Sequence, residues 1–228
     1  WLAMATGAVQ CLLPTAPGHR YQVAYNLRGP CAVGWWDGSV DPLSRRARDG
    51  AGALVFNGKM WLLGGWNPED PVHFAVKGHT NSEVWSSTDG AGWTLVSPAA
   101  PWEGRHTAGY AVHRGRMWIV GGDPLRGHYQ NDVWSSEDGL RWDKILDRVP
   151  WAPRALHYTV AFKDRIWVLG GQTIPPFAPE PEVFHNDVWN TEDGVKWTRV
   201  LEHAPWSPRG MIGGSAVFKD RIWLLGGG

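Results

Sequence analysis

The sequence predicts an all-β fold of repeated four-stranded antiparallel sheets, and three observations support this prediction. A set of landmarks recurs about every 50 residues. It comprises a Gly pair ending an apolar run, a Val-Trp pair and a Pro-Trp pair. Each unit also carries two turn signals, which separate two pairs of short apolar segments. Almost all of the variation in length lies between the Gly pair and Val-Trp, as expected of a surface loop between packed strands. The Gly pairs stand at residues 64–65, 121–122, 170–171 and 226–227.

Each unit divides into four expected strands, and the second unit serves as the example. Segments 106–113 and 116–120 flank the Arg114-Gly115 turn, and segments 132–136 and 141–146 flank Asp138-Gly139. Two-residue turns of this kind connect hairpins because their residues accept positive φ. Two hairpins per unit predict one four-stranded antiparallel sheet. The equivalent turns are Asn57-Gly58, Lys163-Asp164 and Lys219-Asp220 for the first hairpin, and Asp89-Gly90 and Asp193-Gly194 for the second.

Tryptophan is unusually frequent, with 17 residues in a chain of 228. Most of these residues recur at equivalent places in each unit, which is what packing between units requires. We therefore expect them in the core. The recurring positions are Trp61, Trp118, Trp167 and Trp223; Trp85, Trp134 and Trp189; Trp93, Trp142 and Trp197; and Trp102, Trp151 and Trp206.

The composition excludes some partners. The chain has 22 basic and 22 acidic side chains, so it lacks the basic excess that nucleic acids or anionic membranes require. No apolar run reaches the roughly 18 residues of a membrane-spanning helix, which predicts a soluble protein without a membrane span. The compartment stays open, with an extracytoplasmic location favoured. Cys11 and Cys31 are compatible with one disulfide or with two free thiols.

The Gly pair after four apolar positions, followed by spaced aromatic residues, resembles the kelch repeat. The motif Asp-Val-Trp-Ser-Ser-Glu-Asp-Gly-x-x-Trp resembles the repeats of bacterial kelch-type propellers. These propellers are related in fold to those of galactose oxidase and sialic-acid mutarotases. The resemblance covers roughly residues 48–228 and implies a kelch-type β-propeller of four-stranded antiparallel blades. Ser-x-Asp-Gly-x-x-Trp is one residue shorter than the Asp-box of sialidases, so we interpret it as a hairpin turn.

We divide the chain into an irregular segment 1–47, a degenerate blade or closing strands, then blades 48–102, 103–151 and 152–206, and half a blade at 207–228. Closed propellers usually have four to eight blades, so this one is expected to be incomplete. The sequence is compatible with a fragment, with N-terminal strands completing the last blade, or with two chains sharing one ring. The fragment is the interpretation we favour.

The resemblance implies that the variable loops share one face with the turn entering each blade. Ligand-binding candidates on that face are Arg48, Arg105, Arg154, Arg209, His106, His157, Trp66, Tyr129 and Phe177. Guanidinium groups suit carboxylates or sugar acids. The arginines can instead pair with the acid before Val-Trp, namely Glu83, Asp132 or Asp187, and we favour this structural role. The two histidines are likewise expected to be satisfied channel residues rather than bases.

Four loop histidines are candidate metal ligands: His73, His79, His128 and His185. Imidazole binds copper or zinc, but no cofactor is predicted, and copper is kept as an alternative only. We expect a non-catalytic module that binds a glycan, an acidic peptide or a protein partner on the loop face. The alternative is a carbohydrate-active enzyme of the mutarotase or copper-dependent oxidase type at the same place.

Overall fold

The computed structural model describes residues 48–66, 80–210 and 214–227, and the backbone of four short N-terminal strands. His73, His79 and the side chains of Cys11 and Cys31 fall outside the described residues, so the predictions about them stay predictions. The described part contains no helix and is all-β, as expected. The N-terminal strands form two pairs: β1 (Leu2–Ala5) with β2 (Ala8–Cys11), and β3 (Gln22–Val23) with β4 (Val33–Gly34).

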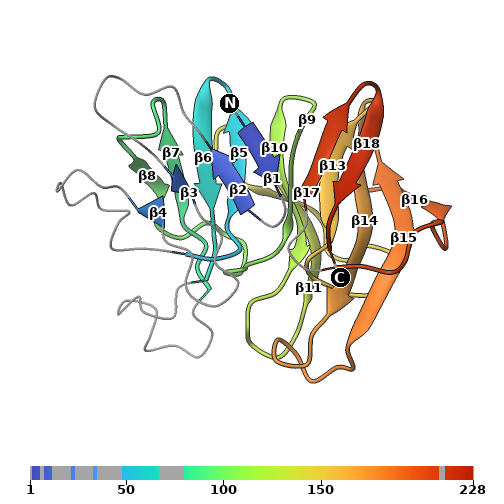
Figure 1. The fold of residues 1–228 in the computed structure, drawn as a ribbon. Helices are drawn as coiled ribbons and strands as arrows, with labels where there is room; N and C mark the ends of the chain where they lie inside the picture. The colour runs from blue at the N-terminus through green and yellow to red at the C-terminus, as the bar shows by residue number, and fades with distance from the viewer. Residues whose placement is uncertain are drawn as a thin grey trace.

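Three four-stranded antiparallel sheets follow, each with its strands side by side in chain order (Figure 1). We call them the first, second and third sheets. A two-stranded C-terminal hairpin comes after them. The first sheet contains β5 (Gly52–Phe56), β6 (Lys59–Leu63), β7 (Val84–Ser87) and β8 (Thr94–Ser97). The second contains β9 (Gly109–His113), β10 (Arg116–Gly122), β11 (Gln130–Ser136) and β12 (Asp143–Leu146). The third contains β13 (Tyr158–Phe162), β14 (Arg165–Thr173), β15 (Val183–Thr191) and β16 (Trp197–Leu201), and the hairpin contains β17 (Gly214–Phe218) and β18 (Arg221–Leu225).

The first turn of each unit has the backbone that its residues favour. Asn57 and Gly58 have φ angles of 48° and 69°, and Lys163 and Asp164 have 48° and 54°. Positive φ at both central positions matches the twist of the flanking strands. The expected first strand of the second unit, 106–113, begins too early, because Thr107 has a φ of 53° and regular pairing starts at Gly109.

The second turn of each unit is held by its own side chains. The Asp138 carboxylate accepts hydrogen bonds from Leu140 N at 2.9 Å and Arg141 N at 2.8 Å, while Trp142 Nε1 donates to Gly139 O at 3.0 Å. The equivalent bonds form around Asp89 and Asp193. The expected strand 141–146 is therefore two residues shorter, because Arg141 and Trp142 belong to this turn.

Consecutive sheets meet along their first strands and pack through tryptophans. We call the contact between the first and second sheets the first seam, and that between the second and third sheets the second seam. In the first seam, a Cβ added to Gly139 would lie 2.1 Å from Trp61 Cζ3, and Trp102 meets Trp142 edge-on at 5.8 Å. In the second seam, a Cβ on Gly194 would lie 2.3 Å from Trp118 Cζ3.

Two backbone hydrogen bonds tie the entry segments of the sheets together at one end. Thr107 N donates to Gly50 O at 2.9 Å, and Leu156 N donates to Thr107 O at 3.0 Å. All three residues have positive φ, between 53° and 61°. The first strands β5, β9, β13 and β17 also contact one another in succession. The sheets therefore fan out from a shared line of first strands.

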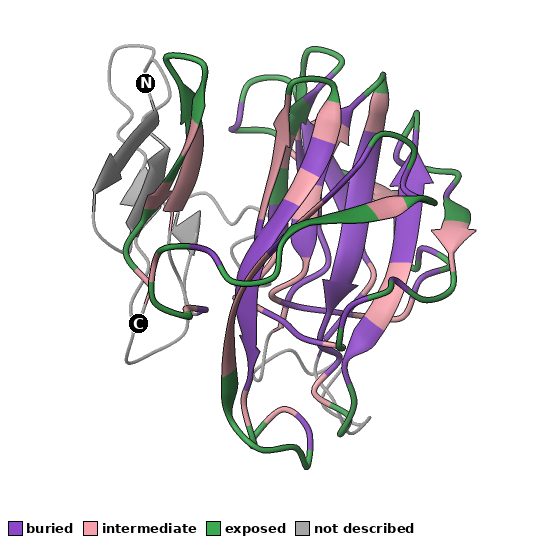
Figure 2. Cartoon of the chain, turned by 90° about the vertical axis from the view of Figure 1, so that its right-hand side faces the viewer, coloured by how far each residue is buried: buried purple, intermediate pink, exposed green. Residues whose placement is uncertain are grey.

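The expectation that the recurring tryptophans are buried is correct for most of those in the first two sheets, holds only in part for the third sheet, where they are partly buried, and is wrong for the hairpin. Trp61 and Trp118 are 5% and 4% exposed, whereas Trp223 is 44% exposed. Figure 2 shows buried residues concentrated in the complete sheets, while the C-terminal hairpin carries intermediate and exposed ones. Trp223 is exposed because, in the described part of the chain, no further sheet packs against it.

Candidate ligand-binding site where the Gly pairs end

One end of each complete sheet carries a pair of residues that differs from unit to unit. We call the arginine before the first strand of each unit the entry arginine: Arg48, Arg105, Arg154 and Arg209. In the three complete sheets, the residue after the Gly pair forms a β-bridge with the residue after the entry arginine. We call these residues the variable end: Asp49 with Trp66, His106 with Asp123, and Ala155 with Gln172. His106 and Trp66 were candidates from sequence. Asp123 and Gln172 were missed, although a position that changes in every unit beside constant Gly pairs is a signal that could have found them.

The central pair of the variable end brings a histidine against a buried carboxylate. His106 Nδ1 lies 2.5 Å from Asp123 Oδ2, although the angle is not that of a hydrogen bond. Asp123 is fully buried, and its Oδ1 accepts a hydrogen bond from Leu125 N at 2.7 Å. The carboxylate therefore organises the following loop and orients the imidazole ring.

Aromatic rings from two other units flank this histidine. The ring centroids of His106 and Phe177 are 5.0 Å apart in an edge-on arrangement, and those of His106 and Trp66 are 6.2 Å apart. Three of the sequence candidates, from three different units, are thus brought together. Contacts of this kind favour offset or edge-on geometry because aromatic faces are negative and edges positive.

Tyr129 fastens the loop that carries Phe177. Its hydroxyl accepts a hydrogen bond from Ile174 N at 2.6 Å and donates one to Ile174 O at 3.0 Å. Gly127 N also donates to Phe177 O at 3.2 Å, so the loops of the second and third sheets are joined. Burial raises the pKa of Tyr129 above its ordinary value, which keeps the hydroxyl neutral and able to donate. Tyr129 therefore positions the loop.

The variable end also holds buried polar atoms that the described protein leaves unpaired. Gln172 is fully buried, and neither its amide nitrogen nor its amide oxygen has a hydrogen-bond partner in the described part of the chain. The same is true of Trp66 Nε1. Such groups carry a desolvation cost of about 1–3 kcal/mol each, so they call for an explanation.

The entry arginines, in contrast, are engaged inside their own sheets. Arg105 is fully buried and donates to Gly121 O and to Asp132 Oδ1, both at 2.8 Å. Arg48 binds Glu83, and Arg154 binds Asp187, in the same way. Burial by itself raises the pKa of Asp132, but the charge and hydrogen bonds of Arg105 outweigh it, so the pKa lies below its ordinary value. The pairing with the acid before Val-Trp is thus present, and direct ligand contact by these arginines stays a prediction.

His157 occupies a separate buried position. Its Nδ1 lies 2.9 Å from Thr159 Oγ1, and its ring packs against Gly109 and Gly121. Burial, followed by the charge of Arg154, lowers the pKa of His157 to about 3. The ring is therefore neutral at pH 7. No described contact joins it to His106.

The candidate metal ligands do not form a group among the residues that the structure describes. His128 Nε2 lies 3.0 Å from Glu103 Oε2 on the surface. Burial, followed by Arg154, lowers the pKa of His185 to about 4. Within the described ranges, no cluster of three or more His, Cys, Asp or Glu side chains is arranged to hold a metal ion.

Comparison with known proteins gives a likeness of fold. No family model matches the chain, and no curated protein matches its sequence. A solved structure titled "Structure of YjhT" superposes with a TM-score of 0.68 at 16% identity, covering 99% of this chain and 75% of the other. Identity this low supports a shared fold alone. No helix in the described residues is long and apolar enough to cross a membrane.

Proposed function

We propose that this chain is a kelch-type β-propeller module that binds a ligand at the variable end, and that the ligand is a glycan. The repeated landmarks, the fan of four-stranded sheets and the shared line of first strands support the propeller. The single observation that carries the binding proposal is the fully buried Gln172, whose amide has no partner among the described residues. Because protein atoms cover the amide in this structure, a ligand would supply the missing donor and acceptor after displacing the residues that cover it.

The chemistry of the variable end favours a sugar over an acidic peptide. Aromatic rings at Trp66 and Phe177 offer apolar faces, and the Gln172 amide offers one acceptor and two donors for hydroxyl groups. The guanidinium groups of Arg105 and Arg154 are already bound to carboxylates, so they are engaged before any anionic ligand arrives. Asp123 adds negative charge at the same place. A neutral glycan satisfies these groups with less electrostatic cost.

The test combines a glycan array with calorimetric titration of any sugar that binds. We expect Gln172→Leu and Phe177→Ala to weaken binding at least tenfold, while Phe218→Ala, an exposed aromatic on the C-terminal hairpin, leaves it unchanged. Circular dichroism confirms that each variant is folded. Equal affinity of Gln172→Leu and the parent for every sugar would show that the variable end is not the site.

The His106–Asp123 pair favours one second candidate, a carbohydrate-active enzyme at the same place. A carboxylate facing Nδ1 orients the ring so that Nε2 can accept or donate a proton. Exchange of sugar anomers, followed by NMR, tests a mutarotase activity, and His106→Gln should remove it. Metal analysis of the purified protein tests the oxidase version, because stoichiometric copper is required for it.

A further inference from the structure

The turn between β5 and β6 is exposed and unobstructed. Its two central residues, Asn57 and Gly58, are both exposed, and a Cβ added to Gly58 would meet no atom within 4 Å. Gly58 N donates no hydrogen bond to any residue in the described ranges. We propose that this turn makes Asn57 a self-modification site, at which the unbound Gly58 nitrogen converts the side-chain amide to a carboxylate.

The reaction needs water as its only co-reactant. Gly58 N loses its proton to the solvent and forms a bond to Cγ of Asn57, and the side-chain nitrogen leaves as ammonia. Water then opens the resulting five-membered imide at one of its two carbonyl carbons, which gives aspartate or isoaspartate. Gly58 places no side chain in the path of the attacking nitrogen. Asparagine is for this reason among the thermolabile residues of proteins.

The second unit offers Asn57 no ion-pair partner. In the later units, the first residue of the equivalent turn forms an ion pair with the second residue of the next turn along. These pairs are Arg114 with Asp164, and Lys163 with Asp220. The residue that would pair with Asn57 in this way is Gly115, which has no side chain. The side chain of Asn57 is therefore not held by the neighbouring turn.

The turns between the third and fourth strands also contain a glycine, but its nitrogen is bound. In the second sheet, Gly139 N donates to Ser136 Oγ at 2.8 Å, and this bond has to break before the nitrogen can attack. The hydrogen bond from Arg141 N is the main cause that lowers the pKa of Asp138, so its carboxylate stays ionised and resists attack. The bond from the glycine nitrogen recurs at Gly90 and Gly194.

Modification would change both the backbone and the charge of the turn. Isoaspartate carries the main chain through the side-chain methylene, so the main chain becomes one atom longer at Asn57. Phe56 pairs directly with Lys59 across this two-residue turn, and Trp61 Nε1 donates to Phe56 O at 3.0 Å. A longer turn no longer matches this register. Either product also adds one negative charge to a chain whose formal net charge is zero.

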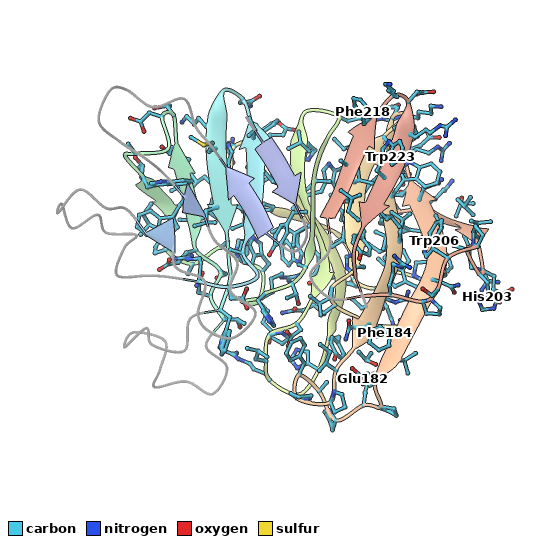
Figure 3. The ribbon with its side chains drawn as sticks, viewed as in Figure 1. Glu182, Phe184, His203, Trp206, Phe218 and Trp223 are labelled. Atoms are coloured by element: carbon cyan, nitrogen blue, oxygen red, sulfur yellow. The ribbon has the colours of Figure 1, made fainter. Side chains whose placement is uncertain are left out.

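The turn lies far from the variable end. Val183, which follows Glu182, pairs with Thr173 near the variable end. Figure 3 shows Glu182 at the bottom of the view, whereas the turn between β5 and β6 lies at the top, as in Figure 1. We therefore expect ligand binding to be unaffected, and the outcomes of the two proposals are independent.

The test incubates the folded full chain in mildly alkaline buffer and follows each site by peptide mapping with mass spectrometry. We expect Asn57 to yield aspartate and isoaspartate, at least tenfold faster than isoaspartate forms at Asp138. A methyltransferase specific for isoaspartate should label the product. Asn57→Lys should remove this signal and still fold, because Lys163 has the same φ of 48° in the equivalent turn. No conversion of Asn57 in the folded chain, under conditions in which the urea-unfolded chain converts, would overturn the proposal.

Two variants carry the same Asn-Gly sequence into other turns. Arg114→Asn places it where the φ angles of Arg114 and Gly115, 47° and 70°, match those of Asn57 and Gly58, so this variant should gain a second site. Asp138→Asn places it where the glycine nitrogen is bound, so this site should convert at least tenfold more slowly than Asn57 in the folded chain and equally fast in urea. Circular dichroism confirms that both variants are folded. Equal rates at the two sites of folded Asp138→Asn would overturn the role given to the unbound nitrogen.

Discussion

The seams and the variable end lie close together, yet they differ in whether their buried polar groups are hydrogen-bonded. In the second seam, Trp118 packs closely against Gly194, and Arg154 is bound to Asp187 and to a Gly-pair carbonyl. At the variable end, Gln172 is buried just as deeply with its amide unpaired in the described chain. The repeating arginines of the complete sheets are thus paired with acids, whereas Gln172, at a position that differs between units, has an amide that no described residue pairs.

The strongest test of this comparison removes a seam tryptophan. Trp118→Ala should lower the free energy of unfolding by about 4 kcal/mol, because a buried aromatic loses its contacts and leaves a cavity. The matched variant Trp223→Ala should cost less than about 1 kcal/mol, since that side chain is 44% exposed. Urea unfolding followed by circular dichroism measures both. Similar losses of unfolding free energy in the two variants would mean that packing in the seam does not stabilise the protein more than the exposed hairpin residue does.

The second test removes one partner of a buried ion pair. Arg105→Ala should cost about 3 kcal/mol, because the Asp132 carboxylate and a Gly-pair carbonyl lose their donor in a buried place. Arg209→Ala should cost less than about 1 kcal/mol, as its guanidinium is more exposed and has no described carboxylate partner. The same urea titration applies. Arg105→Ala without measurable loss would contradict a structural role for the entry arginines.

Prediction from the sequence succeeded for the repeated positions and failed for the positions that differ between units or depend on a neighbouring sheet. Local signals succeeded: Asn57-Gly58 forms a turn of positive φ, and Arg105 has the acidic partner suggested for it. Burial of Trp223 was predicted wrongly because burial depends on a neighbouring sheet rather than on the residue's own unit. Asp123 and Gln172 were missed because a repeat pattern marks the positions that recur, and these two positions differ between units. The contact between His106 and Phe177 joins loops that are 71 positions apart in the sequence, and no local preference specifies a contact at that separation.

A third test measures how the free energy of unfolding depends on pH through the buried side chain of His157. His157 has a folded-state pKa of about 3 against an ordinary value of 6.5, so the unfolded chain binds a proton that the folded chain excludes. The stability contributed by the neutral ring is complete above pH 6.5 and is lost as pH falls toward 3. Between pH 7 and pH 5 this histidine should remove about 2 kcal/mol. His157→Gln should reduce this loss by that amount in denaturant titrations at the two pH values. An unchanged pH dependence in the variant would mean that the ring is protonated in the folded protein.

The smallest expected effect on the free energy of unfolding is at the variable end. It gives the clearest contrast between the variable end and the seams. Gln172→Leu replaces an unpaired buried amide by an apolar group of similar size, which removes a desolvation cost without breaking a described hydrogen bond. The free energy of unfolding should stay within about 0.5 kcal/mol of the parent or rise. Gln172→Ala is the control, because it also removes the side-chain packing against Gly210 and should be less stable than the Leu variant. A loss of more than about 2 kcal/mol in Gln172→Leu would show that the amide is satisfied in the folded protein. In that case Gln172 would belong with the seam residues, and its bonding capacity would not be free for a ligand.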